Sequence, residues 1–168
     1  MALTSPGRWT AELDGDFVVF LIGFRARVSP RALRAVPLLM QMPRMLQELQ
    51  RDPSKGLLSY QQFGGPFGSM VQYWRSFEAL ERFARDPDCR HAQTWREWFR
   101  RAQHLNPAVG IWHETYRVSA GAYEAVYQNV PAGFGLMGAG TAAPLRPGVR
   151  AAARMGVEES DLPVPAQA

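Results

Sequence analysis

The order of predicted elements in this sequence is strand, helix, strand, strand, helix, strand, which predicts an α+β protein with a ferredoxin-like fold. Three observations carry this prediction. Residues 17–24 are an apolar run, two β-rich runs flank a glycine-rich turn at residues 64–68, and residues 110–118 alternate with a period of two. The expected βαββαβ arrangement is an antiparallel sheet with helices on one face. We expect a second copy of the chain to cover the other face, which would make the protein a homodimer.

The first predicted strand and the helices after it follow from apolar content and proline placement. Residues 17–24 are apolar at nearly every position, which predicts a central strand that is covered on both sides. Ser29 followed by Pro30 is typical of a helix start. Pro37 and Pro43 each lack the backbone donor that a continuous helix needs. We therefore expect two short helices rather than one long helix.

The middle of the chain predicts a hairpin and two more helices. Residues 57–63 and 69–75 are β-rich runs, and the stretch between them holds three glycines and a proline. Ser76 has the hydroxyl group of a helix N-cap, and the helix that it starts is expected to end at Asp86. A further helix is predicted over residues 90–103.

The last predicted strand holds the densest chemistry of the sequence. His113 and Glu114 are neighbours on this strand, and neighbouring side chains on a strand point to opposite faces. These two residues should therefore not share one site. A second β-rich run follows at residues 123–127.

Composition divides the chain at residue 131. Beyond Pro131 the sequence is rich in alanine, glycine and proline and has no periodic apolar face. We expect one domain over residues 1–131 and a flexible tail over residues 132–168, with at most some helix near residues 149–155.

Charge and cysteine content exclude several classes of partner and site. The net charge of +4 is spread along the chain without a basic arm, so we expect no nucleic-acid partner. The longest apolar run is too short for a membrane span, and no secretory leader precedes it. The single cysteine, Cys89, fits a reducing cytoplasm, where we expect the protein to be located. The spacing of His, Asp and Glu matches no zinc or non-haem iron site.

Four blocks of sequence carry a resemblance to a known family. In chain order they read DGDFVVFLIGFR, MPRMLQELQRDP, VQYWRSFEALERFARDPD and GIWHETYRVSAGAYEAVY. Together they resemble the family named after a monooxygenase of fumagillin biosynthesis, within the dimeric α/β-barrel superfamily that includes the antibiotic-biosynthesis monooxygenases. The resemblance covers about residues 8–131 and leaves out the tail.

The resemblance implies a homodimer whose two sheets close into a barrel, with a pocket between each sheet and its own helices. The superfamily includes cofactor-free oxygenases that act on electron-rich aromatic molecules, and haem enzymes such as aldoxime dehydratases. We expect a small oxygenase or related oxidoreductase that acts on a hydrophobic, cyclic secondary metabolite. No nicotinamide or flavin fingerprint is present. The alternatives are a haem-binding enzyme and a non-catalytic dimer that binds a small ligand.

His113 is the candidate catalytic residue. Its imidazole could act as a general base at neutral pH, or as an axial ligand if haem is the cofactor. It could also be an ordinary strand histidine with a hydrogen-bonded neighbour. A flat substrate would need an aromatic pocket, and the alternative for aromatic side chains is an aromatic-rich core. The candidate pocket residues are Tyr73, Trp74, His91, Trp95, Trp98, Trp112 and Tyr116.

Overall fold

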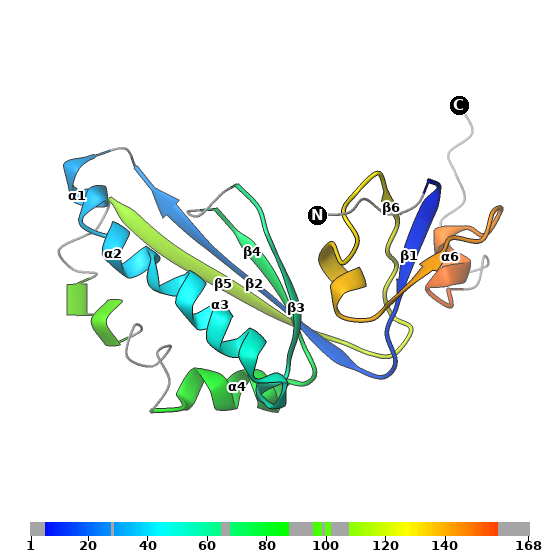
Figure 1. Cartoon of the computed structure of the whole chain (residues 1–168), viewed down its shortest axis with the longest axis horizontal. Helices are drawn as coiled ribbons and strands as arrows, with labels where there is room; N and C mark the ends of the chain where they lie inside the picture. Colours follow the sequence, from blue (N-terminus) through cyan, green and yellow to red (C-terminus); the bar gives the residue numbers. More distant parts are fainter. Residues whose placement is uncertain are drawn as a thin grey trace. The chain divides into compact units, whose positions relative to one another are not determined.

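The computed structural model describes residues 6–27, 29–64, 68–87, 96–98, 100–101 and 108–157. It divides the chain into two units, one of residues Phe17–Arg117 and one of Met1–Asp16 with Val118–Ala168. The larger unit has a four-stranded sheet with helices, and the smaller unit has a three-stranded sheet (Figure 1). In the described part of the chain no helix has the length and hydrophobicity of a membrane span.

The larger unit has the strand order of a ferredoxin-like fold. Its strands are β2 (Phe17–Ala26), β3 (Leu57–Gln62), β4 (Met70–Trp74) and β5 (Val109–Val118). They lie in the order β3-β4-β2-β5, with β2 and β3 both antiparallel to β4. The hairpin between β3 and β4 closes with a 2.8 Å hydrogen bond from Phe63 N to Ser69 O. The predicted α+β class and the βαββαβ order are confirmed.

The helical segment between β2 and β3 differs from the prediction. It consists of α1 (Pro30–Leu33), α2 (Val36–Leu39) and α3 (Gln41–Arg51), followed by the 3₁₀ turn η1 (Pro53–Lys55). Pro43 does not break α3, because it is the third residue of that helix, where a backbone N–H would have no partner within the helix. The sequence predicts two short helices with a kink or break at Pro37 and at Pro43, whereas the structure has three helices and Pro43 lies in the first turn of α3.

The helix that follows β4, α4 (Phe77–Arg85), begins and ends where the sequence predicts. Its N-cap is Ser76, whose Oγ accepts a hydrogen bond from Ala79 N at 3.2 Å. Its C-cap is Asp86. Most of the helix predicted over residues 90–103 lies outside the described residues, although residues 96–98, 100 and 101 are helical.

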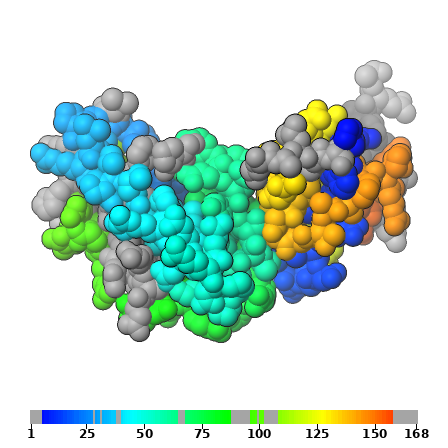
Figure 2. Space-filling view, viewed as in Figure 1, coloured from blue at the N-terminus to red at the C-terminus, as the bar shows by residue number. Residues whose placement is uncertain are grey.

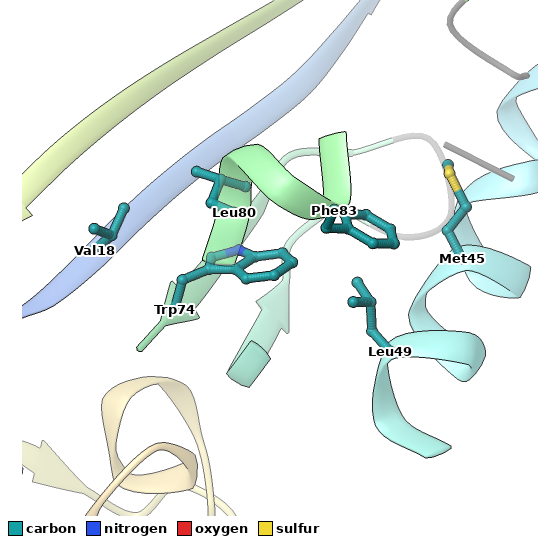
Figure 3. Close-up of a cluster of buried hydrophobic side chains, with 6 residues drawn as sticks. All are labelled: Val18, Met45, Leu49, Trp74, Leu80 and Phe83. Atoms are coloured by element: carbon teal, nitrogen blue, oxygen red, sulfur yellow. The ribbon is translucent and has the colours of Figure 1, made fainter. Parts of the chain in front are cut away.

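The main core lies between the sheet and these helices (Figure 3). Met45 and Leu49 on α3 belong to one buried cluster with Trp74 on β4 and Phe83 on α4, and the Leu49 side chain points toward Phe83. The rings of Trp74 and Phe83 are 5.6 Å apart, and Trp74 is fully buried. Figure 2 shows the atoms of α3 as a continuous layer over this side of the larger unit. These contacts fix α3 and α4 to one face of the sheet.

The smaller unit contains chain that was expected to be a flexible tail. Its sheet has the order β6-β1-β7, formed by β6 (Tyr127–Gln128), β1 (Arg8–Glu12) and β7 (Thr141–Pro144). The 3₁₀ turn η3 (Gly135–Gly138) lies between β6 and β7, and α6 (Ala151–Arg154) matches the short helix predicted there. The structure thus differs from the prediction that residues past 131 form a separate tail.

Backbone pairing explains why this segment is ordered without an apolar pattern. β7 forms an antiparallel pair with β1, from Trp9 opposite Pro144 to Glu12 opposite Thr141. Such pairing uses backbone groups, so alanine and glycine do not prevent it. A side chain at Gly140 would place its Cβ 2.2 Å from the carbonyl oxygen of Glu12, so this close approach requires glycine.

Candidate functional site

A pocket of about 440 Å³ lies between the sheet and α4 in the larger unit. Side chains of β2, β4, β5 and α4 line it, and most of them are apolar. Its polar lining residues are Gln72, Glu81, Arg85, His113 and Thr115. The volume falls within the roughly 300–1,000 Å³ of typical small-molecule sites.

His113 lies on β5 at the exposed end of this pocket. Thr115, two residues further on the strand, lines the same pocket, as the period of two predicts. Both residues are exposed. The imidazole of His113 is 5.5 Å from the ring of Phe20 on β2, with an angle of 36° between the ring planes. The His113 end of the pocket is therefore exposed to solvent.

The buried end of the pocket lies at β4 and holds a polar pair. Trp74 Nε1 donates a 2.9 Å hydrogen bond to Gln72 Oε1, and Gln72 Nε2 donates to Met70 Sδ at 3.4 Å. Gln72 is only 4% exposed, and it is the buried polar residue of the described core. Gln72 lies on the pocket wall between apolar neighbours. It is therefore the polar group that a bound molecule would contact at the buried end of the pocket.

The charged groups of the pocket lie on α4. Arg85 Nη2 forms a 2.7 Å ion pair with Glu81 Oε1, and both side chains are largely exposed. Within the described residues, no three His, Cys, Asp or Glu side chains gather as a metal site would require. The described lining therefore offers one imidazole, one carboxamide, one hydroxyl and one neutralised ion pair to a ligand.

Three of the predicted pocket residues lie on the opposite face of the sheet. Tyr73 alternates with Trp74, and its ring is 6.5 Å from that of Phe17. Trp112 and Tyr116 alternate with His113 and are 40% and 49% exposed. They do not line the pocket, because adjacent strand residues point to opposite faces.

Residues on this opposite face also contact one another. A Cβ on Gly23 would lie 2.7 Å from the indole of Trp112, so the indole lies against this glycine. Tyr116 Oη donates a 2.5 Å hydrogen bond to Glu114, and this bond raises the pKa of the Tyr116 phenol. The expectation that His113 and Glu114 do not share a site agrees with this arrangement.

The remaining candidates are elsewhere. Trp98 is buried in a separate cluster with Ala35, Ala108 and Val109, and its ring is 6.3 Å from that of Phe24. His91 and Trp95 lie outside the described residues, as does Cys89. Of the predicted site residues that the structure describes, it brings together only His113 and Trp74.

Sequence reasoning missed Gln72 as a site residue. The signal was present, because Gln72 alternates between Met70 and Trp74 on a predicted strand. A polar residue on the apolar side of such a strand must find partners in the core. Phe20 was also missed, since residues 17–24 are apolar on both faces and alternation cannot assign a pocket side there.

Comparison with known proteins assigns the family. The sequence pattern of the Monooxygenase af470-like family matches residues 17–136, which is 120 of the 168 residues. The chain belongs to this family. The protein is thus monooxygenase-like, and the predicted resemblance is confirmed. The match includes the whole pocket and ends within η3 of the smaller unit.

Two individual proteins are similar to the chain. Monooxygenase af470 of Aspergillus fumigatus is 32% identical over 87 residues, which cover 48% of this chain and 30% of that protein. The match thus spans less than a third of the curated relative. A dimeric ferredoxin-like protein from an uncultured marine organism superposes with a TM-score of 0.34 at 13% identity, covering 62% of this chain and 96% of that one.

Proposed function

We propose that the pocket beside His113 is the active site of a monooxygenase that acts on a hydrophobic, cyclic secondary metabolite without nicotinamide or flavin. The observation that carries the proposal is the position of an imidazole at the open end of an apolar pocket in a monooxygenase-like family. A flat apolar molecule would bury its rings against Phe20 and Trp74. Its reactive position would then lie near His113.

The proposed reaction needs a base and molecular oxygen. His113 removes a proton from an acidic carbon or phenol of the substrate, and the carbanion form reduces O₂. A new C–O bond forms a hydroperoxide at that carbon. Loss of water then leaves a carbonyl group, so that R₂CH₂ and O₂ become R₂C=O and H₂O. The substrate supplies all the electrons, so the reaction needs no external reductant.

Haem is the alternative cofactor, and His113 would be its axial ligand. A haem site also needs cationic partners for the two propionate groups. Among the described lining residues Arg85 is the one arginine or lysine, and its guanidinium is bound to Glu81. These residues fit haem less well than they fit a neutral organic molecule. Haemin titration tests this alternative, because a Soret shift that is lost in His113→Ala would establish a haem ligand.

We also propose that the chain forms a homodimer through the sheet face opposite the pocket. Trp112 and Tyr116 are large exposed hydrophobic residues on that face. Burial of exposed aromatic side chains is a common source of stability in homodimers. Light scattering should give twice the chain mass, and Trp112→Ser with Tyr116→Ser should shift the protein toward the monomer.

Oxygen consumption tests the proposed activity. The purified chain is incubated with anthrone-like and naphthol-like compounds in an oxygen electrode, and His113→Asn is compared with Glu114→Gln. Glu114 is a matched control, since it is adjacent in sequence and lies on the other face of β5. We expect His113→Asn to lose at least about tenfold in rate and Glu114→Gln to keep the wild-type rate.

The rival function is a non-catalytic protein that binds such molecules in the same pocket. Binding without oxygen consumption across the panel would favour this rival. Equal rates for wild type and His113→Asn would contradict the proposed role of the imidazole.

A further inference from the structure

We infer that Gln72 is a specificity-determining residue, and that its carboxamide binds an acceptor oxygen at the far end of a flat substrate whose other end lies against His113. This inference rests on the proposed function, because it takes the pocket as the substrate site. It adds a chemical class of substrate to that proposal.

The orientation of the Gln72 amide is fixed by its neighbour. The indole nitrogen of Trp74 carries a hydrogen and can only donate. It lies 2.9 Å from Gln72 Oε1 in a fully buried setting. A flipped amide would place two donors against each other, so the oxygen must face the indole and Nε2 must face away from it.

The Nε2 group has donor capacity to spare. It has two hydrogens, and one points to Met70 Sδ at 3.4 Å, where the thioether is a weak acceptor. No other bond of Gln72 Nε2 occurs within the described residues. A buried N–H group without a strong acceptor is costly, and a ligand oxygen in the adjoining pocket would satisfy it.

The sheet sets the length of molecule that could reach both ends. Gln72 on β4 is the direct partner of Phe20 on β2, and the Phe20 ring lies beside the His113 ring on β5. Adjacent strands are about 4.8 Å apart and two such spacings separate β4 from β5, so the backbones of Gln72 and His113 are at least about 10 Å apart. Two fused aromatic rings that lie over Phe20 would span this row.

The difference in burial between the two ends of the pocket sets the orientation of the bound substrate. Gln72 is at the buried end of the pocket, whereas His113 is exposed at the open end. The acceptor oxygen would therefore enter first, and the acidic hydroxyl or carbon would remain near His113. The inferred substrate class is a fused-ring aromatic molecule with a ketone or quinone oxygen at one end and an ionisable group at the other.

A pair of probes that differ by one oxygen tests the inference. 6-Acetyl-2-naphthol has a ketone opposite its hydroxyl group, and 6-isopropyl-2-naphthol has the same shape without that oxygen. Isothermal titration calorimetry with the wild-type chain should give about tenfold tighter binding of the ketone, the value of one good hydrogen bond. In Gln72→Met both probes should bind with equal affinity.

A second measurement needs no variant. In the ¹⁵N-labelled wild-type protein, the side-chain amide protons of Gln72 should shift on addition of the ketone and stay in place on addition of the isopropyl probe. This measurement keeps the inference testable if Gln72→Met does not fold.

Oxygen uptake in the same samples separates the inference from the proposed function. A ketone preference without oxygen uptake supports the Gln72 contact and removes the proposed activity. Oxygen uptake with equal affinity for both probes, or a ketone preference that persists in Gln72→Met, overturns the inference alone. Absence of binding by either probe overturns it as well.

Discussion

The hydrogen bond between Trp74 and Gln72 should couple the two residues in stability, and a double-mutant cycle can measure this coupling. The partners are almost fully buried, and their atoms are 2.9 Å apart. The cycle consists of Trp74→Phe, Gln72→Met and the double variant. Phenylalanine keeps an aromatic ring without a donor, and methionine keeps the chain length of glutamine without an amide.

Each single variant should lower the free energy of unfolding substantially. Trp74→Phe leaves Gln72 Oε1 without its donor and leaves space where the larger ring was, for a total loss of about 2–4 kcal/mol. Gln72→Met leaves the indole N–H buried without its carbonyl acceptor, for a loss of about 1–3 kcal/mol. In the double variant neither orphaned group exists. The double variant should therefore be more stable than the sum of the single effects predicts, by about 1–2 kcal/mol.

Urea unfolding of the full-length chain, followed by circular dichroism and by tryptophan fluorescence, is the assay. Coincident transitions are needed, because a chain with two units need not unfold in one step. Trp74→Phe combined with Tyr127→Phe is the control cycle, since Tyr127 belongs to the smaller unit and its effect should be additive within about 0.5 kcal/mol. Additivity of the Trp74 and Gln72 variants within the same limit would refute the reasoning, and with it the fixed orientation of the Gln72 amide.

Three further outcomes are expected. Ser76→Ala should lower the free energy of unfolding by about 1 kcal/mol, because Ala79 N loses its capping oxygen, whereas Ser76→Asp should retain most of the stability in the same urea assay. Tyr127→Phe should cost about 0.5–1.5 kcal/mol, because Leu136 N donates to the Tyr127 hydroxyl at 3.1 Å and would lose that acceptor. The hydrogen bond to Glu114 raises the pKa of Tyr116, so the stability that it adds is present below the usual tyrosine pKa and is lost as the pH rises through the raised pKa. The pH midpoint of tyrosinate formation, measured by ultraviolet absorbance, should therefore be lower in Glu114→Gln than in the wild type. An unchanged titration curve would contradict the raised pKa.

Local signals predicted the fold of the larger unit well. The apolar run of β2, the hairpin and the Ser76 cap are each encoded within a few neighbouring residues, and each appears where expected. Pro43 was misjudged because its effect depends on its distance from the helix start, and that start is not marked by a capping side chain. The effect of a proline on a helix therefore depends on its position in that helix, and the presence of a proline alone does not predict a break.

Non-local pairing limited what could be predicted for the smaller unit. β1 is paired with β7 across more than a hundred residues of sequence. Tyr123 strengthens the unit in the same way, since its hydroxyl accepts from Leu13 N at 2.7 Å and donates to Leu13 O at 3.2 Å. Neither contact could be predicted from periodicity, because this part of the sequence has no apolar stripe of the kind that marks a packed helix or strand.

The alternation of side chains along a strand explains which candidate site residues lie in one pocket. The sequence prediction grouped these residues by their aromatic side chains alone, but the pleat of the sheet places them on opposite faces. Trp74 lines the pocket, whereas Tyr73 and Trp112 face away from it. One strand, β5, therefore holds the proposed base on one face and the proposed dimer contacts on the other. Because the two sets alternate residue by residue, substitutions at His113 and Trp112 separate catalysis from assembly without moving the strand. Gln72 can be recognised as a site residue only when the face of the strand on which it lies is known. A polar side chain on the buried face needs a partner, whereas a polar side chain on an exposed face is ordinary.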